Sequence, residues 1–195
     1  MLSVFAAGSL RPAFAGLDAR FTYDNARALA ARIEGGERPD VFCSASPADP
    51  ARLHALGLLG EPVVFARNRV VIAVRREAPD PDLRSARLAI EVAGVPLGDY
   101  TRELFDALRV TVAPAYEETI VDAVADRVLS GDADAGVLYA TDVAARPALR
   151  AVAPGVDVVA TYVAGVVTPS PGAAAFVAAL PDHPALVRAG FQPRR

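Results

Sequence analysis

The alternation of short, continuous apolar runs with helical stretches constrains the fold more than any other feature of this chain. The runs consist of valine, isoleucine and alanine, without the polar alternation of a half-exposed strand. Strands of that composition are buried on both faces, as in parallel sheets covered by helices. The pattern predicts an α/β protein. The expected strands are 3–7, 40–44, 70–74, 87–92, 136–139 and a pair over 156–162 and 164–167.

The helical stretches between these runs have recognisable ends. Asp24 or Asn25 can cap the first long helix, because a short polar side chain accepts a hydrogen bond from the free N–H groups there. Ser9 precedes Pro12 and is expected to cap a short helix after the first strand. Glycines follow several of the helices, as is typical of helix ends. The expected helices are 26–33, 48–56, 100–108, 117–129, 173–180 and 184–189.

A change in composition divides the chain after the third expected strand. Residues 77–82 are polar and proline-rich, and a strand returns at Arg87. We interpret this segment as a crossing between two lobes, with the return crossing near residues 156–166, where two extended segments have few turn signals. The predicted organisation is a discontinuous lobe one, residues 1–78 plus 163–195, and a lobe two of residues 79–162.

Composition excludes several classes of protein. Apolar residues make up 53% of the 195 residues, enough for a substantial core. Charged residues, prolines and glycines interrupt every apolar run before the roughly 18 residues that a membrane helix needs, so no stable membrane insertion is expected. A net charge of −3 argues against a nucleic-acid partner. The single cysteine, Cys43, excludes an internal disulfide and any multi-cysteine metal site.

Residues suited to catalysis are scarce. The two histidines, His54 and His183, are expected in a helix and in a turn. No glycine-rich phosphate loop, paired-histidine metal motif or dinucleotide fingerprint occurs, and the segment around Ser9 lacks the flanking glycine of a nucleophile elbow. We therefore expect no enzyme, no cofactor and no directly bound metal cation.

Helix N-termini that directly follow strands are what the chain does supply. Such a terminus offers unpaired N–H groups and a partial positive charge, and a serine there adds a hydroxyl donor. In open α/β sheets these termini gather at the carboxyl edge of the strands, where ligands bind. Two lobes arranged in this way can hold a small anion without cationic side chains.

Seven segments, in order, cover nearly the whole chain. They are VFAAGSL at 4–10, ALAARIEGG at 28–36, PDVFCSA at 39–45, NRVVIAV at 68–74, VPLGDY at 95–100, GDADAGVLYATD at 131–142 and GFQP at 190–193. Each is similar to a segment of the molybdate-binding proteins of ABC importers, and 131–142 is the most specific. The resemblance implies a type II periplasmic-binding-protein fold, with two Rossmann-like lobes joined by a two-strand hinge and the ligand in the cleft between them.

The resemblance also implies a set of ligand contacts. The first binding serine of the family corresponds to Ser9, and the tyrosine whose hydroxyl reaches the anion corresponds to Tyr139. Two backbone amides, in the valine-proline turn and at the start of a lobe-two helix, correspond to Leu97 and Val121. From spacing alone, Tyr139 could instead be a core tyrosine with a satisfied hydroxyl.

The sequence departs from the family where the second binding serine stands. The family's phenylalanine-x-serine-serine-glycine segment reads YDNAR at 23–27, so that Ala26 replaces the serine and Arg27 a small residue. A missing hydroxyl donor weakens the hold on a dehydrated dianion, and the Arg27 guanidinium can supply a bidentate fork in its place. The alternative is that Arg27 is a solvated helix residue. Residues 120–122 also differ, and the aspartate-proline after the strand at 87–92 is missing.

The leading interpretation is a solute receptor that captures molybdate or tungstate and passes it to the permease of an ABC importer, acting as a monomer. Two alternatives stay open: a receptor of the same fold for a different small anion, and a cytoplasmic ligand sensor without a transport role. The resemblance implies a periplasmic or cell-surface location. Because Met1 leads almost directly into the first strand, no signal peptide is expected in this chain, and a cytoplasmic location is possible.

Overall fold

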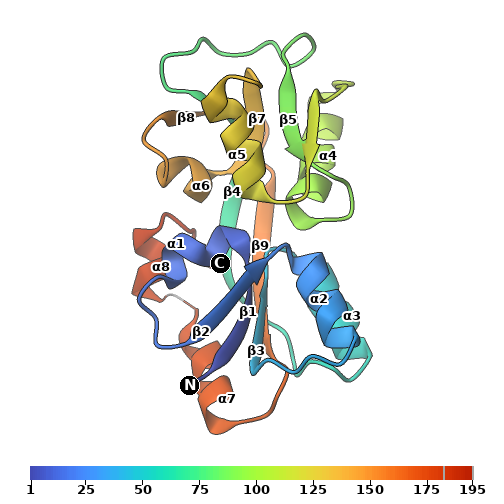
Figure 1. Ribbon diagram of the computed structural model, residues 1–195, viewed down its shortest axis with the longest axis vertical. Helices are drawn as coiled ribbons and strands as arrows, with labels where there is room; N and C mark the ends of the chain where they lie inside the picture. Colours follow the sequence, from blue (N-terminus) through green and yellow to red (C-terminus); the bar gives the residue numbers. More distant parts are fainter. Residues whose placement is uncertain (182, 195) are drawn as a thin grey trace. The chain divides into compact units, whose positions relative to one another are not determined.

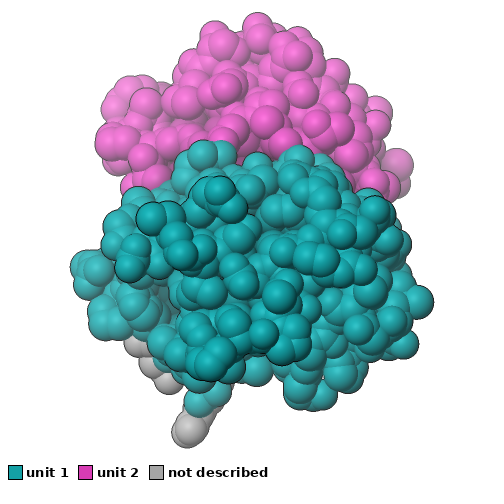
Figure 2. All heavy atoms as spheres, turned by 60° about the horizontal axis from the view of Figure 1, so that its bottom comes forward, with its two compact units in different colours: residues 1–67, 161–195 teal, residues 68–160 magenta. Residues whose placement is uncertain are grey.

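The computed structural model describes residues 1–181 and 183–194, which form two compact units. Unit 1 is discontinuous, Met1–Arg67 with Thr161–Arg195, and unit 2 is Asn68–Ala160 (Figures 1 and 2). The chain crosses between them in β4 (Val63–Arg75) and β9 (Val159–Val166). The first crossing thus lies inside β4, earlier than the predicted boundary after residue 78, because the strand extends back to Val63. The second crossing lies between Ala160 and Thr161, two residues before the predicted one.

Unit 1 is built on a mainly parallel sheet in the order β2-β1-β3-β9. Strand β1 runs parallel to both β2 and β3, while β9 is antiparallel to β3. The strands that precede β4 are β1 (Ser3–Ala7), β2 (Arg20–Asp24) and β3 (Val41–Ser44). All four residues of β3 are buried, as the apolar run predicts for a strand covered on both faces.

Helices cover both faces of the unit 1 sheet, with α2 and α3 on one side and α1, α7 and α8 on the other (Figure 1). Their bounds, after the 3-10 turn η1 (Gly8–Leu10), are α1 (Arg11–Phe14), α2 (Ala26–Glu34), α3 (Ala48–Ala55), α7 (Pro171–Ala179) and α8 (Pro184–Arg188). Leu29 and Ile33, four residues apart on α2, are fully buried beside Phe42. On the other side, Phe14 of α1 contacts Phe176 of α7 edge to face.

Unit 2 has a sheet in the order β4-β7-β5-β6, with β8 also paired to β4. Strand β5 is parallel to β6 and β7, whereas β4 is antiparallel to β7 and β8. The strands are β5 (Leu88–Glu91), β6 (Tyr116–Glu118), β7 (Ala135–Tyr139) and β8 (Leu149–Val152), and the helices are α4 (Pro96–Leu108), α5 (Val121–Ser130) and α6 (Ala140–Ala144). Helices α4 and α5 pack on β5 and β7. The predicted α/β fold is confirmed.

Several elements differ from the sequence-based expectation. The helix predicted over 117–129 begins only at Val121, because residues 116–118 pair with β5 as β6. The two strands expected near residues 156–167 form the single strand β9. Strands β2 and β8 were not predicted. Among the described residues, no helix is long and apolar enough to span a membrane.

Candidate functional site

Ser9 lies where the chain leaves the carboxyl end of β1. It is the middle residue of η1, is 3% exposed, and its Oγ lies 2.8 Å from the hydroxyl oxygen of Tyr162 in β9. The prediction that Ser9 caps a helix is wrong: neither η1 nor α1 has a side-chain cap, and Leu10 occupies the N-cap position of α1. The Ser9 hydroxyl is therefore held by a side chain 153 residues away and not by the adjacent helix.

Ala26 begins α2 at the carboxyl end of β2. Of the two predicted caps, Asn25 is the one used: its Oδ1 accepts a hydrogen bond from the N–H of Ala28 at 2.8 Å. Ala26 itself is 1% exposed and contributes no polar side chain. Because β1 and β2 are parallel, Ser9 and the start of α2 share one edge of the unit 1 sheet.

Arg27 forms an ion pair inside unit 1. Its Nε lies 2.9 Å from Oδ1 of Asp49, a residue of α3 whose side chain is 3% exposed. Asp49 also accepts a hydrogen bond from Nη2 of Arg52 at 2.9 Å. Arg27 thus compensates a buried carboxylate, so its use as a fork for an anion stays a prediction that competes with this ion pair.

Leu97 is the second residue of α4, after Pro96, and is 1% exposed. A Cβ on the next residue, Gly98, would lie 1.8 Å from the carbonyl oxygen of Val92, so only glycine lets α4 begin this close to the end of β5. The same close approach places the backbone N–H groups of Leu97 and Gly98 in hydrogen bonds to the carboxyl group of Glu91. The backbone amide of Leu97, which the resemblance implies as a ligand contact, therefore already donates a hydrogen bond to Glu91.

Glu91 was not predicted as part of the site. Burial, followed by the charge of Asp142, raises the pKa of Glu91 to about 8, although the two backbone hydrogen bonds act in the opposite direction. The available signal in the sequence was a glutamate that ends the otherwise apolar strand LAIE. Since a charged residue at a strand end is usually exposed, that signal was weak.

Val121 and Tyr139 complete the predicted contacts in unit 2. Val121 is the first residue of α5, and the N-cap residue, Ile120, offers no side-chain hydrogen bond. Tyr139 is the last residue of β7, 2% exposed, and stands at the N-cap position of α6. Its backbone N–H hydrogen-bonds to the carboxyl group of Asp142, whose pKa burial raises to about 7.

The structure gathers the predicted residues within each unit. Strands β5, β6 and β7 are parallel, so the starts of α4 and α5 and the side chain position of Tyr139 lie at one edge of the unit 2 sheet. Ser9 and Ala26 lie at the corresponding edge in unit 1. Each unit therefore has, at one edge of its sheet, helix starts with backbone N–H groups and a buried hydroxyl from the predicted set, Ser9 in unit 1 and Tyr139 in unit 2. Among the described residues, no cluster of histidine, cysteine, aspartate or glutamate could hold a metal ion.

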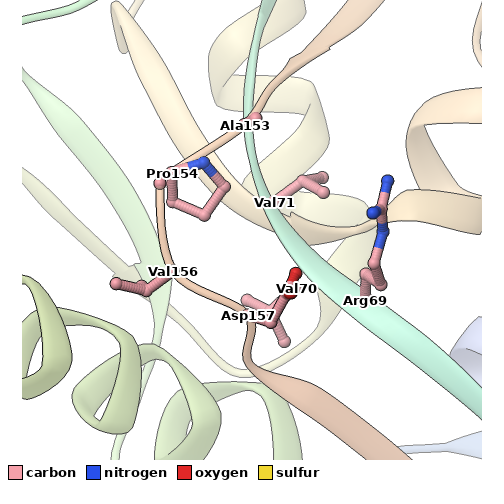
Figure 3. A pocket seen from close by; sticks show the side chains of 8 residues that line it. Arg69, Val70, Val71, Ala153, Pro154, Val156 and Asp157 are labelled. Carbon is pink, nitrogen blue, oxygen red and sulfur yellow. The ribbon is translucent and has the colours of Figure 1, made fainter.

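A separate hollow of about 160 Å³ lies in unit 2 between β4 and the loop that follows β8 (Figure 3). Arg69 and Asp157 supply its charged side chains, and valines, Pro154 and backbone supply the rest. None of the predicted site residues is among its eight lining residues. The hollow is therefore distinct from the edge that carries Leu97, Val121 and Tyr139.

This chain resembles one group of proteins by sequence and several solved structures by fold. The molybdate-binding protein ModA of Mycobacterium tuberculosis is 34% identical, and the alignment covers 71% of this chain and 60% of that relative. This chain therefore spans less than two thirds of the relative's length. Among solved structures, the periplasmic molybdate-binding protein of Azotobacter vinelandii has a TM-score of 0.80 at 17% identity, with 98% of each chain covered.

A second solved structure with a similar fold is that of a sulfate-binding protein. The sulfate-binding protein SubI from Mycobacterium tuberculosis has a TM-score of 0.82 at 14% identity, covering 98% of this chain and 86% of that one. At such identities the structures show the fold alone, and they confirm the type II periplasmic-binding-protein class. The family description "bacterial extracellular solute-binding protein" matches residues 2–191. This chain belongs to that family of bacterial extracellular solute-binding proteins.

Proposed function

We propose that this protein captures a small tetrahedral oxyanion, molybdate or tungstate, and delivers it to the permease of an ABC importer. The observation that carries the proposal is one edge of the sheet in each unit, where parallel strands end and helices begin beside a buried hydroxyl that the resemblance implies as a ligand contact: Ser9 in unit 1 and Tyr139 in unit 2. Membership of the extracellular solute-binding family and the similarity to a molybdate-binding protein support the same proposal.

The chemistry of these edges suits a dehydrated dianion. Backbone N–H groups at helix starts and hydroxyl groups donate hydrogen bonds, and each bond to a charged group contributes about 1.5 to 3 kcal/mol. In the proposal, Ser9 and Tyr139 donate through their hydroxyls, and Leu97 and Val121 through their backbone amides. Without a cationic side chain in this set, the ligand is held by several modest contacts and can leave again, as a carrier requires.

A receptor for a different small anion is the second candidate, and two observations favour it. In unit 1, Ala26 stands where the molybdate-binding family has a serine, so that edge lacks one hydroxyl. In unit 2, the carboxyl group of Glu91 accepts hydrogen bonds from the backbone amides at the start of α4. Both features reduce the donors open to a dianion. The sulfate-binding relative shows that this fold serves more than one anion receptor.

Isothermal titration calorimetry with molybdate, tungstate, sulfate and phosphate tests the proposal directly. We expect micromolar or tighter binding of molybdate or tungstate and at least about tenfold weaker binding of the other two, which corresponds to roughly 1.4 kcal/mol. Tighter binding of sulfate or phosphate would favour the second candidate. No heat with any of the four would refute the proposal and would exclude sulfate and phosphate as the anion of the second candidate. The importer partner and the periplasmic or cell-surface location rest on the family relationship and belong to the same proposal.

A further inference from the structure

The Ser9 hydroxyl has a partner that the sequence did not indicate. Ser9 Oγ and the Tyr162 hydroxyl oxygen lie 2.8 Å apart, and both side chains are buried. The two residues come from η1 and β9, and both belong to unit 1. A buried hydroxyl pair at this distance is a full hydrogen bond, in which either oxygen can be the donor.

The Tyr162 ring is held on two sides, so its hydroxyl has a defined position. The ring is fully buried and contacts Phe65 and Phe191 edge to face, with centroids 6.1 and 5.1 Å away. Its neighbour in β9, Val163, pairs with Ser44 of β3. A serine hydroxyl, by contrast, rotates among three staggered positions unless a partner fixes it.

The balance of donors decides which way this hydrogen bond runs when an oxyanion is present. A serine hydroxyl carries one proton and can accept two hydrogen bonds. If Ser9 gives its proton to an anion that has no proton of its own, the bond between the two hydroxyls must run from Tyr162 to Ser9. The tyrosine then occupies an acceptor site of Ser9 Oγ and leaves the serine proton for the ligand.

We propose that Tyr162 is a positioning residue, whose hydroxyl fixes the rotamer and the proton of Ser9 for donation to the bound oxyanion. This inference rests on the proposed function, because it assigns a purpose to Ser9 as a ligand contact. It predicts that Tyr162 affects affinity only through Ser9. A tyrosine that merely stabilises the unit 1 core would affect folding and leave the affinity per folded molecule unchanged.

A double-mutant cycle in molybdate affinity tests this, measured by calorimetry on the parent, Ser9→Ala, Tyr162→Phe and the double variant. We expect Ser9→Ala to weaken binding about tenfold to a hundredfold and Tyr162→Phe about threefold to tenfold. The double variant should bind like Ser9→Ala alone. Tyr116→Phe, which removes a tyrosine hydroxyl on β6 of unit 2, is the matched control and should bind like the parent.

The outcomes separate failure of this inference from failure of the proposed function. If the parent binds molybdate and Ser9→Ala binds it equally well, the proposed contact at Ser9 is wrong and the inference is overturned with it. If Ser9→Ala weakens binding but Tyr162→Phe does not, or if the two losses multiply in the double variant, Ser9 stays a ligand contact and the role of Tyr162 is refuted.

A second variant keeps the test decisive if Tyr162→Phe folds poorly. Phe191→Leu loosens one side of the ring and keeps both hydroxyls. We expect it to lower affinity about twofold to threefold with Ser9 present and not at all in the Ser9→Ala background. A loss of the same size in both backgrounds would contradict positioning through Ser9. Thermal unfolding of each unliganded variant reports the fraction that is folded.

Discussion

Unit 1 and unit 2 bury carboxyl groups near their candidate edges in opposite ways. In unit 1, Asp49 lies between the guanidinium groups of Arg27 and Arg52, both at 2.9 Å from Oδ1. In unit 2, the carboxyl group of Glu91 has backbone amides as its partners. Oδ1 of Asp142 lies 4.0 Å from Nη1 of Arg146, and Oδ2 of Asp142 lacks a hydrogen-bond partner among the described residues. Cations compensate the first carboxylate, whereas burial dominates at the other two.

The difference determines whether the charge near each candidate edge is fixed or depends on pH. A buried carboxylate between two arginines keeps its charge balanced by fixed cations. Burial raises the pKa of Glu91 to about 8 and that of Asp142 to about 7, and the charge of Asp142 further raises the pKa of Glu91. The charge beside the start of α4 therefore changes with pH near neutrality. The charged residues on surrounding elements are Asp99, Arg102, Glu117, Glu118, Asp122, Arg127 and Arg146.

Removing both arginines of unit 1 is expected to have the largest effect. The double variant Arg27→Ala and Arg52→Ala leaves Asp49 buried without a cation, which should lower the free energy of unfolding by about 3 kcal/mol at pH 7. Urea unfolding followed by circular dichroism measures it. Adding Asp49→Asn should recover most of the loss, because it removes the uncompensated charge. If the double variant is as stable as the parent, the ion pairs of unit 1 do not compensate Asp49.

Tyr139→Phe tests the hydroxyl of unit 2 against that of unit 1. We expect molybdate binding to weaken by roughly 1.5 to 3 kcal/mol, since a hydrogen bond to a charged group is lost. Calorimetry gives the affinity, and thermal unfolding of the unliganded protein should change little. Equal affinity of parent and variant would restrict the site to unit 1 and to backbone amides.

The free energy of unfolding should fall as the pH rises through neutrality, because two buried carboxyl groups of unit 2 lose their protons. The folded-state pKa values of Glu91 and Asp142, about 8 and about 7, lie above the unfolded values, so the native state binds more protons between about pH 4.5 and 8. The free energy of unfolding is then greatest below that window and decreases across it, by up to about 1.4 kcal/mol per pH unit for each group between its unfolded and folded pKa values.

Glu91→Gln should flatten this decrease in urea unfolding measured across a pH series. Glu61→Gln is the matched control in unit 1, and because the Glu61 side chain is 84% exposed it should keep the parent's slope. A stability that rises with pH through this window in the parent would show that the buried carboxyls of unit 2 do not dominate its proton uptake.

Arg27→Ala is expected to have the smallest effect on ligand binding. Because Nε of Arg27 is engaged by Asp49, the affinity for each anion of the panel should change less than about threefold. A loss well above tenfold, greatest for the preferred anion, would instead support the predicted role of Arg27 as a bidentate fork. Arg32→Ala, which removes an arginine further along α2 that pairs with Glu37, is the control.

The sequence by itself determined the fold class and much of the order of elements. Apolar runs predicted β1, β3, β5 and β7, because a strand buried on both faces needs apolar residues at successive positions. It missed β2, an edge strand whose residues are only partly buried or exposed. It also predicted a helix across residues 117–120, where Glu117 instead pairs with Ile90 of β5.

Only the tertiary structure decided the partners of the candidate site residues. Ser9 meets Tyr162 across 153 residues, Arg27 meets Asp49 on another helix, and Glu91 reaches the first amides of α4. The spacing of apolar residues along the sequence indicates which segments form helices and strands. A hydrogen bond between distant segments depends instead on the packing that brings those segments together. The sequence therefore determined which edges of the sheets carry the candidate residues, and the packing decided which of their polar groups already have partners.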